Sequence, residues 1–414
     1  MTDKGLKITV VKDGQPIPQN IVKKFNLQIR DYATNLQYDL ICDFVGIVRR
    51  ENEILFAMPK HYMSIESFNK LSLEKKINHI KLILNVVFTY EKNLTYDSFE
   101  NDKDLKTDFS FEAYFKIYDY FKKYGLFYDK KENIEKGYKG HLSWHKILSS
   151  SKKIISHNNL ILFPFYVNKR ENSTNLITKA MAFAINYTYY VLGDFVDLPN
   201  AVQLASWGVD KDMENNSSSV AFQLENLQNK IFKDADKELL NELIIFFRGL
   251  SSSKNNAIKD FKHYHFNDVW EKAVELYLND YFLCIHDDNF IFDSKGSNKH
   301  FKKIALKNYN VVKPHDILQP DHYYLDESED KQYIFDSKYY TNLHEFDHKQ
   351  FVYHILLMNR AAITYDALIV PTSGKTRTQV FVNINASYLP KEFNHIKIYL
   401  EHINMTAVLK NFIS

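Results

Sequence analysis

The sequence predicts a multidomain fold of the α+β and α/β classes. In it, a β-rich and then helical N-terminal region precedes a C-terminal domain with a mixed sheet flanked by helices. The chain has 414 residues, which is too long for one ordinary domain. Short segments rich in β-branched and apolar residues occupy 6–60, and apolar residues at helical spacing occupy 174–250. The last third alternates between the two patterns.

The composition is that of a folded globular protein, with 45% hydrophobic and 25% charged residues. A net charge of +2 neither requires nor excludes nucleic acid, because the placement of charge decides binding to a polyanion. Only Cys42 and Cys284 are present, too few for a disulfide framework or a zinc site. No apolar segment approaches the roughly 20 residues of a membrane span, and the N-terminus lacks an apolar signal core. We therefore expect a cytoplasmic protein.

Strands are predicted first, at 38–48 and 54–60, joined by a polar turn. Apolar residues at helical spacing then predict a helix over 73–90. The tract Gly-His-Leu-Ser-Trp-His-Lys-Ile at 140–147 is basic and aromatic. Its Trp144 either anchors a core at a strand-to-helix junction, which we favour, or stacks on nucleic acid.

Helices are predicted at 180–196 and around 239–247, and polar residues at 251–256 interrupt the pattern. We place the domain boundary nearby. Residues 1–235 form an N-terminal region that binds DNA or a partner, and residues 236–414 form the C-terminal domain.

The C-terminal domain contains, in order, a helix (266–283), a strand (289–293), two hairpin strands (318–325 and 331–340), a helix (343–359) and strands (367–371, 378–386 and 395–401). The hairpin strands are aromatic and aliphatic, and an acidic tract unfit for a core separates them.

The hairpin brings acids together. If its turn is centred between Ser328 and Glu329, antiparallel pairing sets Asp321 opposite Asp336, with Cβ atoms roughly 4.5–5.5 Å apart. Strand alternation places Lys338 on the face of Asp336. We therefore expect two carboxylates and one amine at one place.

Two carboxylates without Cys or His suit Mg²⁺, which takes one or two carboxylates together with substrate phosphate oxygens. Such a metal polarises a phosphoryl oxygen and activates water. Lys338 would orient or deprotonate that water and offset charge on the phosphate. Ser337, between Asp336 and Lys338, is a further candidate ligand. The chemistry is that of a phosphodiesterase.

Pro-Asp at 320–321, followed fifteen residues later by Asp-x-Lys at 336–338, resembles the PD-(D/E)xK nuclease superfamily, whose α-β-β-β-α-β core matches the predicted order of elements. More narrowly, Gln-Pro-Asp at 319–321 with Phe-Asp-Ser-Lys-Tyr-Tyr at 335–340 resembles the LlaJI/McrC group of restriction endonuclease subunits. The resemblance implies a Mg²⁺-dependent DNA endonuclease subunit of a bacterial restriction and antiviral defence system. It also implies a McrB-like AAA+ GTPase partner that the N-terminal region engages.

Val-Trp-Glu at 269–271 resembles the aromatic-Glu pair that this family places ahead of its metal site. Glu271 would add a ligand or hold a metal-bound water. The alternative is a solvated helix face, because Glu275 lies four residues further on the same face.

Gln350 shares a helix face with Asp347 and His354, and Gln-x-x-Tyr at 350–353 resembles a motif found after the Asp-x-Lys strand of related nucleases. Gln350 would contact a DNA phosphate or fix Lys338. An ordinary solvent-exposed face is the open alternative.

Six lysines and no acid lie between 295 and 313, just before the site strand. We expect this segment to contact DNA phosphates. Its lysines are Lys295, Lys299, Lys302, Lys303, Lys307 and Lys313.

Ile-Phe-Asp-Ser-Lys occurs twice, at 291–295 and at 334–338. Fifteen residues before Asp336 lies Asp321, whereas fifteen before Asp293 lies Leu278, inside a predicted helix. We therefore assign the site to the second copy.

Two other functions stay open. The chain could be a stand-alone type II restriction endonuclease, or a non-catalytic assembly or DNA-binding subunit that stimulates a motor. Ser-Gly-Lys-Thr at 373–376 is predicted to be a turn, because Ile369 stands where a phosphate-binding loop needs glycine. A nucleotide-driven motor would have to be a separate protein.

Overall fold

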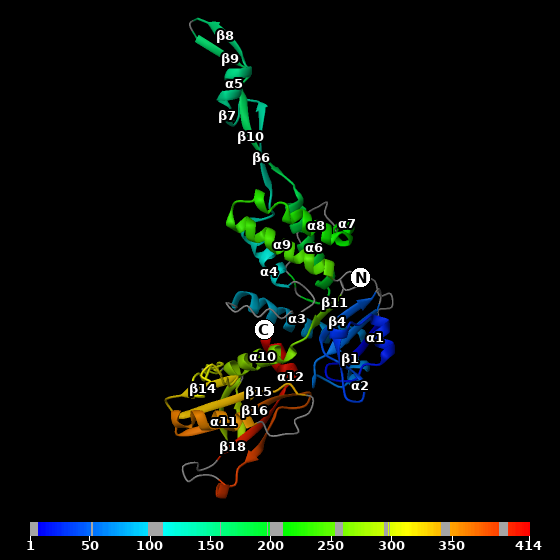
Figure 1. Cartoon of the computed structure of the whole chain (residues 1–414), viewed down its shortest axis with the longest axis vertical. Coiled ribbons are helices and arrows are strands. Elements are labelled where there is room, and N and C mark those ends of the chain that lie inside the picture. Colours follow the sequence, from blue (N-terminus) through cyan, green and yellow to red (C-terminus); the bar gives the residue numbers. More distant parts are fainter. Residues whose placement is uncertain are drawn as a thin grey trace. The chain divides into compact units, whose positions relative to one another are not determined.

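In a computed structural model, the chain divides into two compact units (Figure 1). Unit 1 comprises residues 1–109, 194–197 and 256–414, and unit 2 comprises 110–193 and 198–255. The units do not follow the single predicted boundary at 235, because segments from both ends of the chain form unit 1. The residues that the structure describes are 7–50, 53–97, 111–157, 159–196, 198, 210–252, 260–293, 297, 299–340, 348–388 and 396–414.

Unit 1 contains an N-terminal four-stranded sheet of order β1-β5-β4-β11. β1 runs parallel to β5, whereas β4 is antiparallel to both β5 and β11. The elements here are β1 (Lys7–Lys12), α1 (Gln19–Phe25), β2 (Tyr32–Thr34), β3 (Leu40–Cys42), β4 (Val45–Arg50), β5 (Glu53–Met58), α2 (Ile65–Asn69), α3 (Leu73–Asp97) and β11 (Asp260–His263). The strands expected between 38 and 60 and the helix expected from 73 are confirmed.

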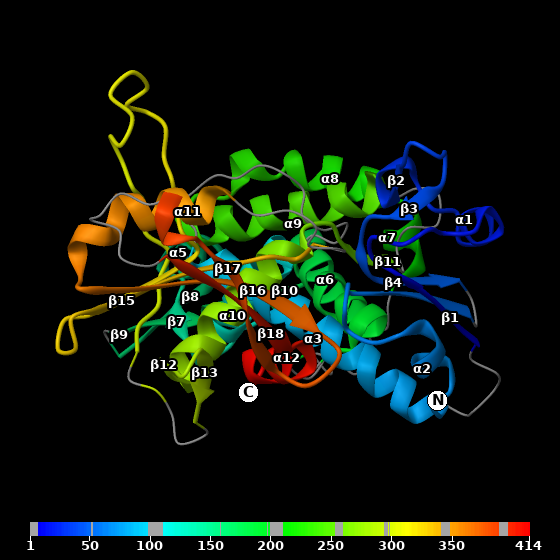
Figure 2. The ribbon, with the colours of Figure 1, turned by 90° about the horizontal axis from the view of Figure 1, so that it is seen from below.

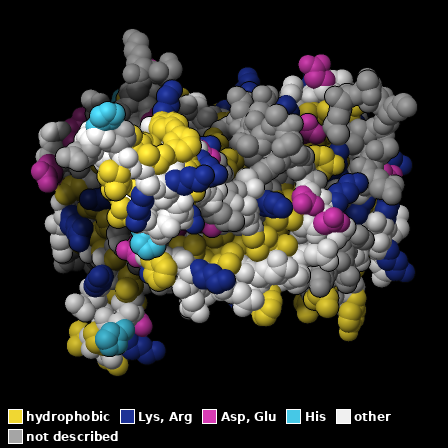
Figure 3. Space-filling view, turned by 90° about the horizontal axis from the view of Figure 1, so that it is seen from above, with side chains coloured by type: hydrophobic (Ala, Val, Ile, Leu, Met, Phe, Trp, Pro, Cys, Tyr) yellow, Lys and Arg dark blue, Asp and Glu magenta, His cyan; other side chains and the backbone are white. Residues whose placement is uncertain are grey.

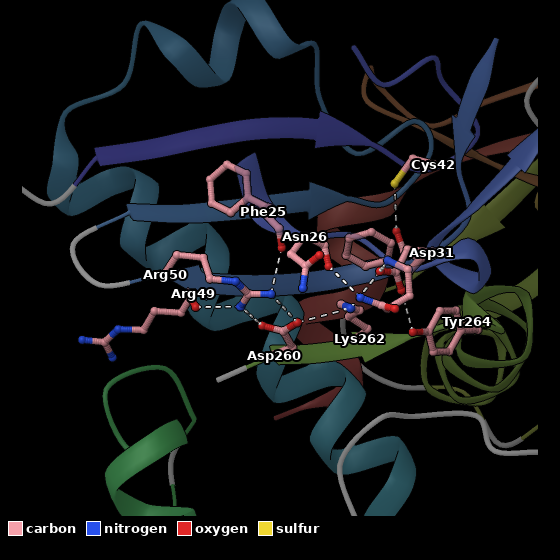
Figure 4. Close-up of polar contacts among 11 residues, drawn as sticks. Phe25, Asn26, Asp31, Cys42, Arg49, Arg50, Asp260, Lys262 and Tyr264 are labelled. Carbon is pink, nitrogen blue, oxygen red and sulfur yellow. Dashed lines mark hydrogen bonds and ion pairs between the residues drawn. The ribbon is translucent and has the colours of Figure 1, made fainter. Parts of the chain in front are cut away.

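β11 is held in this sheet by buried charges (Figure 4). Lys262 Nζ lies 2.9 Å from Asp31 Oδ2 and 3.3 Å from Asp260 Oδ2, and Arg50 also pairs with Asp260. The Tyr264 hydroxyl donates to Asp31 Oδ1 at 2.9 Å. Removing one partner would leave a buried charge uncompensated, which is strongly destabilising. This network of charges therefore holds β11 in the sheet, just ahead of the helix that begins at Phe266.

The C-terminal part of unit 1 has a five-stranded sheet of order β14-β15-β16-β18-β17. β15, β16 and β18 are parallel, and β14 and β17 flank them antiparallel. The elements are α10 (Phe266–Tyr281), β12 (Phe282–His286), β13 (Asn289–Phe292), β14 (His322–Asp326), β15 (Lys331–Ser337), α11 (His348–Leu357), β16 (Ile363–Thr372), β17 (Arg377–Asn383), β18 (Lys397–Asn404) and α12 (Met405–Phe412). The mixed sheet with flanking helices is confirmed. The predicted residues 343–347 of the second helix lie outside the described part.

The sheet is covered on both faces, as Figure 2 shows for β15, β16 and β18. Ile334 packs against Tyr353 and Leu357 of α11. Its neighbour Phe335 points to the opposite face, where its ring lies 5.5 Å from that of Phe282, directly after α10. Alternation along β15 therefore buries both of its faces.

The strand expected at 289–293 forms, but it does not join this sheet. β13 pairs with β12 in a separate hairpin. The predicted helix therefore ends at Tyr281, and Phe282 begins a strand that the sequence pattern did not distinguish from the helix.

Unit 2 has a helical core and a strand-rich arm. Phe183 of α6 stacks on Phe247 of α9 with ring centroids 5.3 Å apart, so the two predicted helical segments pack together. The elements are α4 (Phe111–Tyr124), β6 (Asp129–Lys136), β7 (His141–Leu142), α5 (Trp144–Ser150), β8 (Lys152–Ser156), β9 (Asn159–Phe163), β10 (Tyr166–Ser173), α6 (Leu176–Leu192), α7 (Lys211–Asn215), α8 (Ser217–Glu225) and α9 (Asp234–Ser252).

The β8–β9 hairpin exposes apolar side chains. Ile155 is 81% exposed and Leu160 is 58% exposed, and Figure 3 shows apolar side chains there beside Lys and Arg. Trp144 does begin a helix after a strand, but it is 56% exposed, so the favoured core role is wrong. The short helix α5 buries Ile147 instead.

Candidate active site

The hairpin register brings the two predicted acids together. β14 and β15 pair His322 with Phe335 and Asp326 with Lys331. Continuing that register by one residue sets Asp321 opposite Asp336, as the sequence predicts. The backbone N–H of Ser337 donates to Asp321 Oδ2 at 3.0 Å, which holds this carboxylate at the end of β15.

Asp321 lies in a strongly negative setting. Its burial, the charges of Asp336 and Glu271, and a hydrogen bond with Asp336 raise the pKa of Asp321 well above its ordinary value. Lys303 partly balances these charges, with Nζ 2.7 Å from Glu271 Oε1 and 3.9 Å from Asp321 Oδ1. Glu271 of α10 therefore faces the carboxylate pair rather than only solvent.

Lys338 also lies where the sequence placed it. Its Nζ pairs with Asp336, and both side chains are largely buried. Its backbone N–H donates to the carbonyl of Ile369 in β16 at 2.8 Å. β15 lies between β14 and β16, so its backbone is held where Lys338 follows.

These residues fit a hard divalent cation. The donors are carboxylates, which Mg²⁺ prefers. The raised pKa of Asp321 reflects first its burial and then the negative charges of Asp336 and Glu271, which a cation would neutralise. Asp321, Asp336, Glu271 and the backbone of Ser337 are at hand. Within the described ranges, no three His, Cys, Asp or Glu side chains are already gathered closely enough to hold a metal, so the Asp321–Asp336 pair is the centre of the candidate site.

Gln350 is not at the surface. It is 1% exposed, and its Nε2 donates to the Ile334 carbonyl at 2.6 Å and to Asp366 Oδ1 at 3.3 Å. Asp366 also bonds His354 Nδ1 at 2.5 Å. The predicted phosphate contact and the solvent-exposed alternative are both wrong, because this polar group faces the sheet and fixes β15 beneath the site. Asp347 lies outside the described residues.

The lysine segment serves two purposes. Lys299 pairs with Asp326 at 2.9 Å, and Lys303 pairs with the site acids, so neither projects freely toward DNA. Lys302, Lys307 and Lys313 are exposed. Lys295 lies outside the described residues. The loop between the bridges at Lys302 and Leu318 extends from the sheet (yellow, upper left of Figure 2).

Sequence reasoning missed His322, next to Asp321. His322 is fully buried, and its Nε2 lies 2.7 Å from Ser337 Oγ. Burial, with the nearby charges of Lys303 and Lys272, lowers the pKa of His322 to about 3, so the ring is neutral. Its hydrogen bond with Ser337 fixes the orientation of the Ser337 side chain. The one sequence feature that could have drawn attention to His322 is its position directly after Asp321.

A second omission is the contact between the N-terminal sheet and the residues after Lys338. The backbone N–H of Lys60 donates to the Tyr339 hydroxyl at 2.7 Å, and His61 Nε2 lies 2.7 Å from the Tyr340 carbonyl oxygen. Tyr339 is buried and bonds Asp13 as well. No spacing rule links residues so far apart in sequence, so only the fold could reveal this contact.

A pocket of about 320 Å³ opens at this contact. Its lining residues are Asp13, Asp43, Lys60, Tyr264, Phe266, Asn267, Ser337, Lys338, Tyr339 and Tyr340. Two of them, Ser337 and Lys338, also belong to the candidate active site, so the two features share a wall.

No helix in the described part of the chain is both long and apolar enough to cross a membrane.

Comparison with known protein families gives a match over residues 44–414 to the model described as LlaJI restriction endonuclease. No curated protein matches the chain.

Among solved structures, two from Thermococcus gammatolerans are similar to this chain. One is a half-complex of McrB AAA+ hexamers with bound McrC, with 13% identity, 98% of each chain covered and a TM-score of 0.39. The other is the McrBC complex, with 12% identity, 64% of this chain and 85% of the other covered, and a TM-score of 0.24.

Proposed function

This chain belongs to the LlaJI restriction endonuclease family, and from that premise we propose that it is a Mg²⁺-dependent DNA endonuclease subunit of a bacterial restriction system. We propose further that the C-terminal part of unit 1, from α10 at Phe266 onward, carries a PD-(D/E)xK nuclease domain. The observation that carries the proposal is the meeting of Asp321 and Asp336 at the end of one hairpin, with Lys338 paired to Asp336.

Asp321 and Asp336 would hold the cation, with Glu271 and the Ser337 backbone as further oxygen donors. When bound, Mg²⁺ supplies Lewis-acid activation of the scissile phosphate and of the attacking water. The buried pair of carboxylates supports this role, because two like charges so close favour a compensating cation.

Lys338 would donate hydrogen bonds from Nζ to the water or to a phosphate oxygen. There it orients the nucleophile, accepts or returns a proton, and offsets the charge that develops on the phosphate. Its pairing with Asp336 positions Nζ for this task. Gln350 contributes by holding the β15 backbone at Ile334, without touching the substrate.

Lys302, Lys307 and Lys313 would bind the DNA backbone beside the site. Their exposure on one loop next to β14 supports this role, and phosphate contacts of this kind supply affinity without base specificity. Lys299 and Lys303 are assigned to the internal ion pairs instead.

We also propose a McrB-like AAA+ GTPase as partner, as the LlaJI/McrC resemblance implies. Unit 2 would bind it. The exposed apolar residues of the β8–β9 hairpin support a protein contact, because contiguous exposed apolar side chains mark interaction sites.

Plasmid cleavage tests the proposal. Supercoiled DNA is incubated with the purified chain in Mg²⁺ or in EDTA, with and without the candidate McrB-like GTPase and GTP. We expect cleavage in Mg²⁺, none in EDTA, and strong stimulation by the GTPase with GTP. Cleavage at the wild-type rate in thorough EDTA would contradict the metal mechanism.

The same experiment separates the partner from its alternative. Efficient site-specific cleavage by the chain alone, unaffected by GTP, would favour a stand-alone type II enzyme. Stimulation of GTP hydrolysis by a chain that never cuts DNA would favour a non-catalytic subunit.

A further inference from the structure

The pocket beside Lys338 combines three kinds of side chain. Asp13 and Asp43 directly follow β1 and β3, and Lys60 comes from the loop after β5. The rings of Tyr264, Phe266, Tyr339 and Tyr340 complete the lining. Its volume of about 320 Å³ lies at the lower end of the range for sites that bind small organic molecules.

The walls are held in place by contacts on several sides. Lys60 Nζ lies 4.9 Å from the centre of the Tyr339 ring and 3.9 Å from Asp13. The rings of Phe266 and Tyr339 lie 5.5 Å apart, and Lys338 Nζ lies 5.9 Å from the centre of the Tyr340 ring. Such supports give a shaped pocket before any ligand arrives.

Its position limits what can enter. Ser337 and Lys338 line the pocket and also border the Asp321–Asp336 pair. A DNA strand whose phosphate lies at that pair therefore passes the pocket with its adjoining nucleotide.

The lining suits that nucleotide. The ring of Tyr340 is 56% exposed, and aromatic rings stack on bases without regard to sequence. Lys60 and Lys338 suit the neighbouring phosphates.

Carboxylates accept hydrogen bonds only, so the exposed Asp43 would favour a base that presents an amino group, as cytosine, adenine and guanine do. Asp13 is buried and already bonds Tyr339 and Lys60, so it supports the pocket wall instead. Thymine has no amino group, and its single N3–H donor stands between two carbonyl oxygens, so it would be a poorer partner for a carboxylate.

On this basis we propose that the pocket takes up one unstacked nucleotide directly beside the scissile phosphate and prefers a base with an exocyclic amino group. The proposal rests on the proposed nuclease function. It assigns to the N-terminal sheet a direct share in substrate binding, through Asp43 and Lys60.

A DNA substrate with one missing base tests it. The cut is first mapped on an end-labelled duplex, and abasic sites are then placed singly at each of the four positions around it. We expect cleavage to slow at least tenfold for one position adjoining the cut, and less than threefold for the others. A thymine at that position should slow cleavage about fivefold relative to cytosine.

The variant Asp43→Ala tests whether the effect of the abasic site arises in the pocket. We expect this variant to cut intact DNA about tenfold more slowly and to lose most of its sensitivity to the abasic position. Glu66→Ala, which removes an exposed acid of α2 outside the pocket, should keep wild-type behaviour. Equal loss at every position, or an Asp43→Ala enzyme as sensitive as wild type, would overturn the proposal.

Binding of dCMP and dTMP, measured by calorimetry, separates this proposal from the nuclease function. We expect dCMP to bind at least fivefold more tightly than dTMP, and Asp43→Ala to remove the difference. If dCMP binds in this way but no DNA is ever cut, the nuclease function fails and the pocket stands. If DNA is cut but dCMP shows neither preference nor dependence on Asp43, the pocket proposal fails alone.

Discussion

The two copies of Ile-Phe-Asp-Ser-Lys share a sequence but not a structural setting. The first copy begins in β13, whose partner is the neighbouring β12 in a two-stranded hairpin. The second copy lies in β15, between β14 and β16 in a five-stranded sheet. Asp293 donates its backbone N–H to the Tyr281 carbonyl, whereas Asp336 faces a second acid across the hairpin.

The difference shows that five residues do not make the proposed site. Among the described residues, β13 pairs with β12 alone, and Asp293 bonds the backbone of Tyr281 rather than standing opposite an acid. The second copy has Asp321 opposite Asp336, a strand on each side, and the buried Gln350 against Ile334. These come from distant segments that the fold assembles around β15.

Replacing the opposed acid should have the largest effect. Asp321→Asn keeps an acceptor for the Ser337 N–H but removes half of the carboxylate pair. We expect cleavage to fall by more than about 10³-fold, because metal-ion stabilisation contributes several kcal/mol. Circular dichroism and DNA affinity, measured by anisotropy, should change little, since phosphate contacts supply most affinity.

Asp287→Asn, at the exposed turn between β12 and β13, is the matched control and should cut normally. A fully active Asp321→Asn protein would remove the distinction between the two hairpins.

Replacing the lysine of each Ile-Phe-Asp-Ser-Lys segment tests which of the two segments carries out the chemistry. We expect Lys338→Ala to lower the single-turnover rate by about 10²–10⁴-fold, as is typical of a positioned proton-transfer group. Lys295→Ala, at the equivalent place in the first copy, should at most weaken DNA binding and its dependence on salt. The reverse ranking would assign the chemistry to the first copy.

The sheet around the second copy also contains a buried acid. Glu401 of β18 lies beside Ile369, the residue paired with Ser337, and burial raises its pKa to about 7, against a hydrogen bond from Thr378 that lowers it. Because the folded pKa is raised, the stability contribution of the neutral acid is full below about pH 4.5 and is lost as pH rises through 7.

Glu401→Gln should therefore gain stability relative to wild type between pH 5 and pH 8, by roughly 2–3 kcal/mol. Urea unfolding at both pH values measures the difference. Glu327→Gln, in the exposed hairpin turn, should show none. A constant difference between Glu401→Gln and wild type across this range would contradict the raised pKa.

The contact after Lys338 should have the smallest effect. Tyr339→Phe keeps the ring but removes the hydroxyl that bonds the Lys60 N–H. The same hydroxyl also bonds Asp13. We expect kcat to fall about tenfold with KM unchanged, because each lost buried hydrogen bond costs about 1–3 kcal/mol and Lys338 would be less well positioned. In a Lys338→Ala background the same change should have almost no further effect. Additive losses would show that Tyr339 does not act through Lys338.

The sequence was sufficient for what depends on local pattern. Strand alternation and the acidic turn placed Asp321 opposite Asp336, and helical spacing located α3 and α10. It failed where the outcome depends on distant partners. Gln350 looked like a surface residue because its partners, Asp366 and the Ile334 carbonyl, lie on other elements.

Burial of single residues was equally hard to predict. Trp144 is apolar enough for a core, but the short helix α5 buries Ile147 instead. The return of β11 to the N-terminal sheet also escaped prediction, because it depends on buried charges from three separate segments.

The central claim is that the setting of the second copy, and not its sequence, creates the active site. Its most direct test compares Asp336→Asn with Asp293→Asn in single-turnover cleavage of one labelled duplex in Mg²⁺. We predict that Asp336→Asn cuts more than about 10³-fold more slowly than wild type, while Asp293→Asn stays within threefold of it. Equal losses in the two variants, or an inactive Asp293→Asn beside an active Asp336→Asn, would contradict the claim.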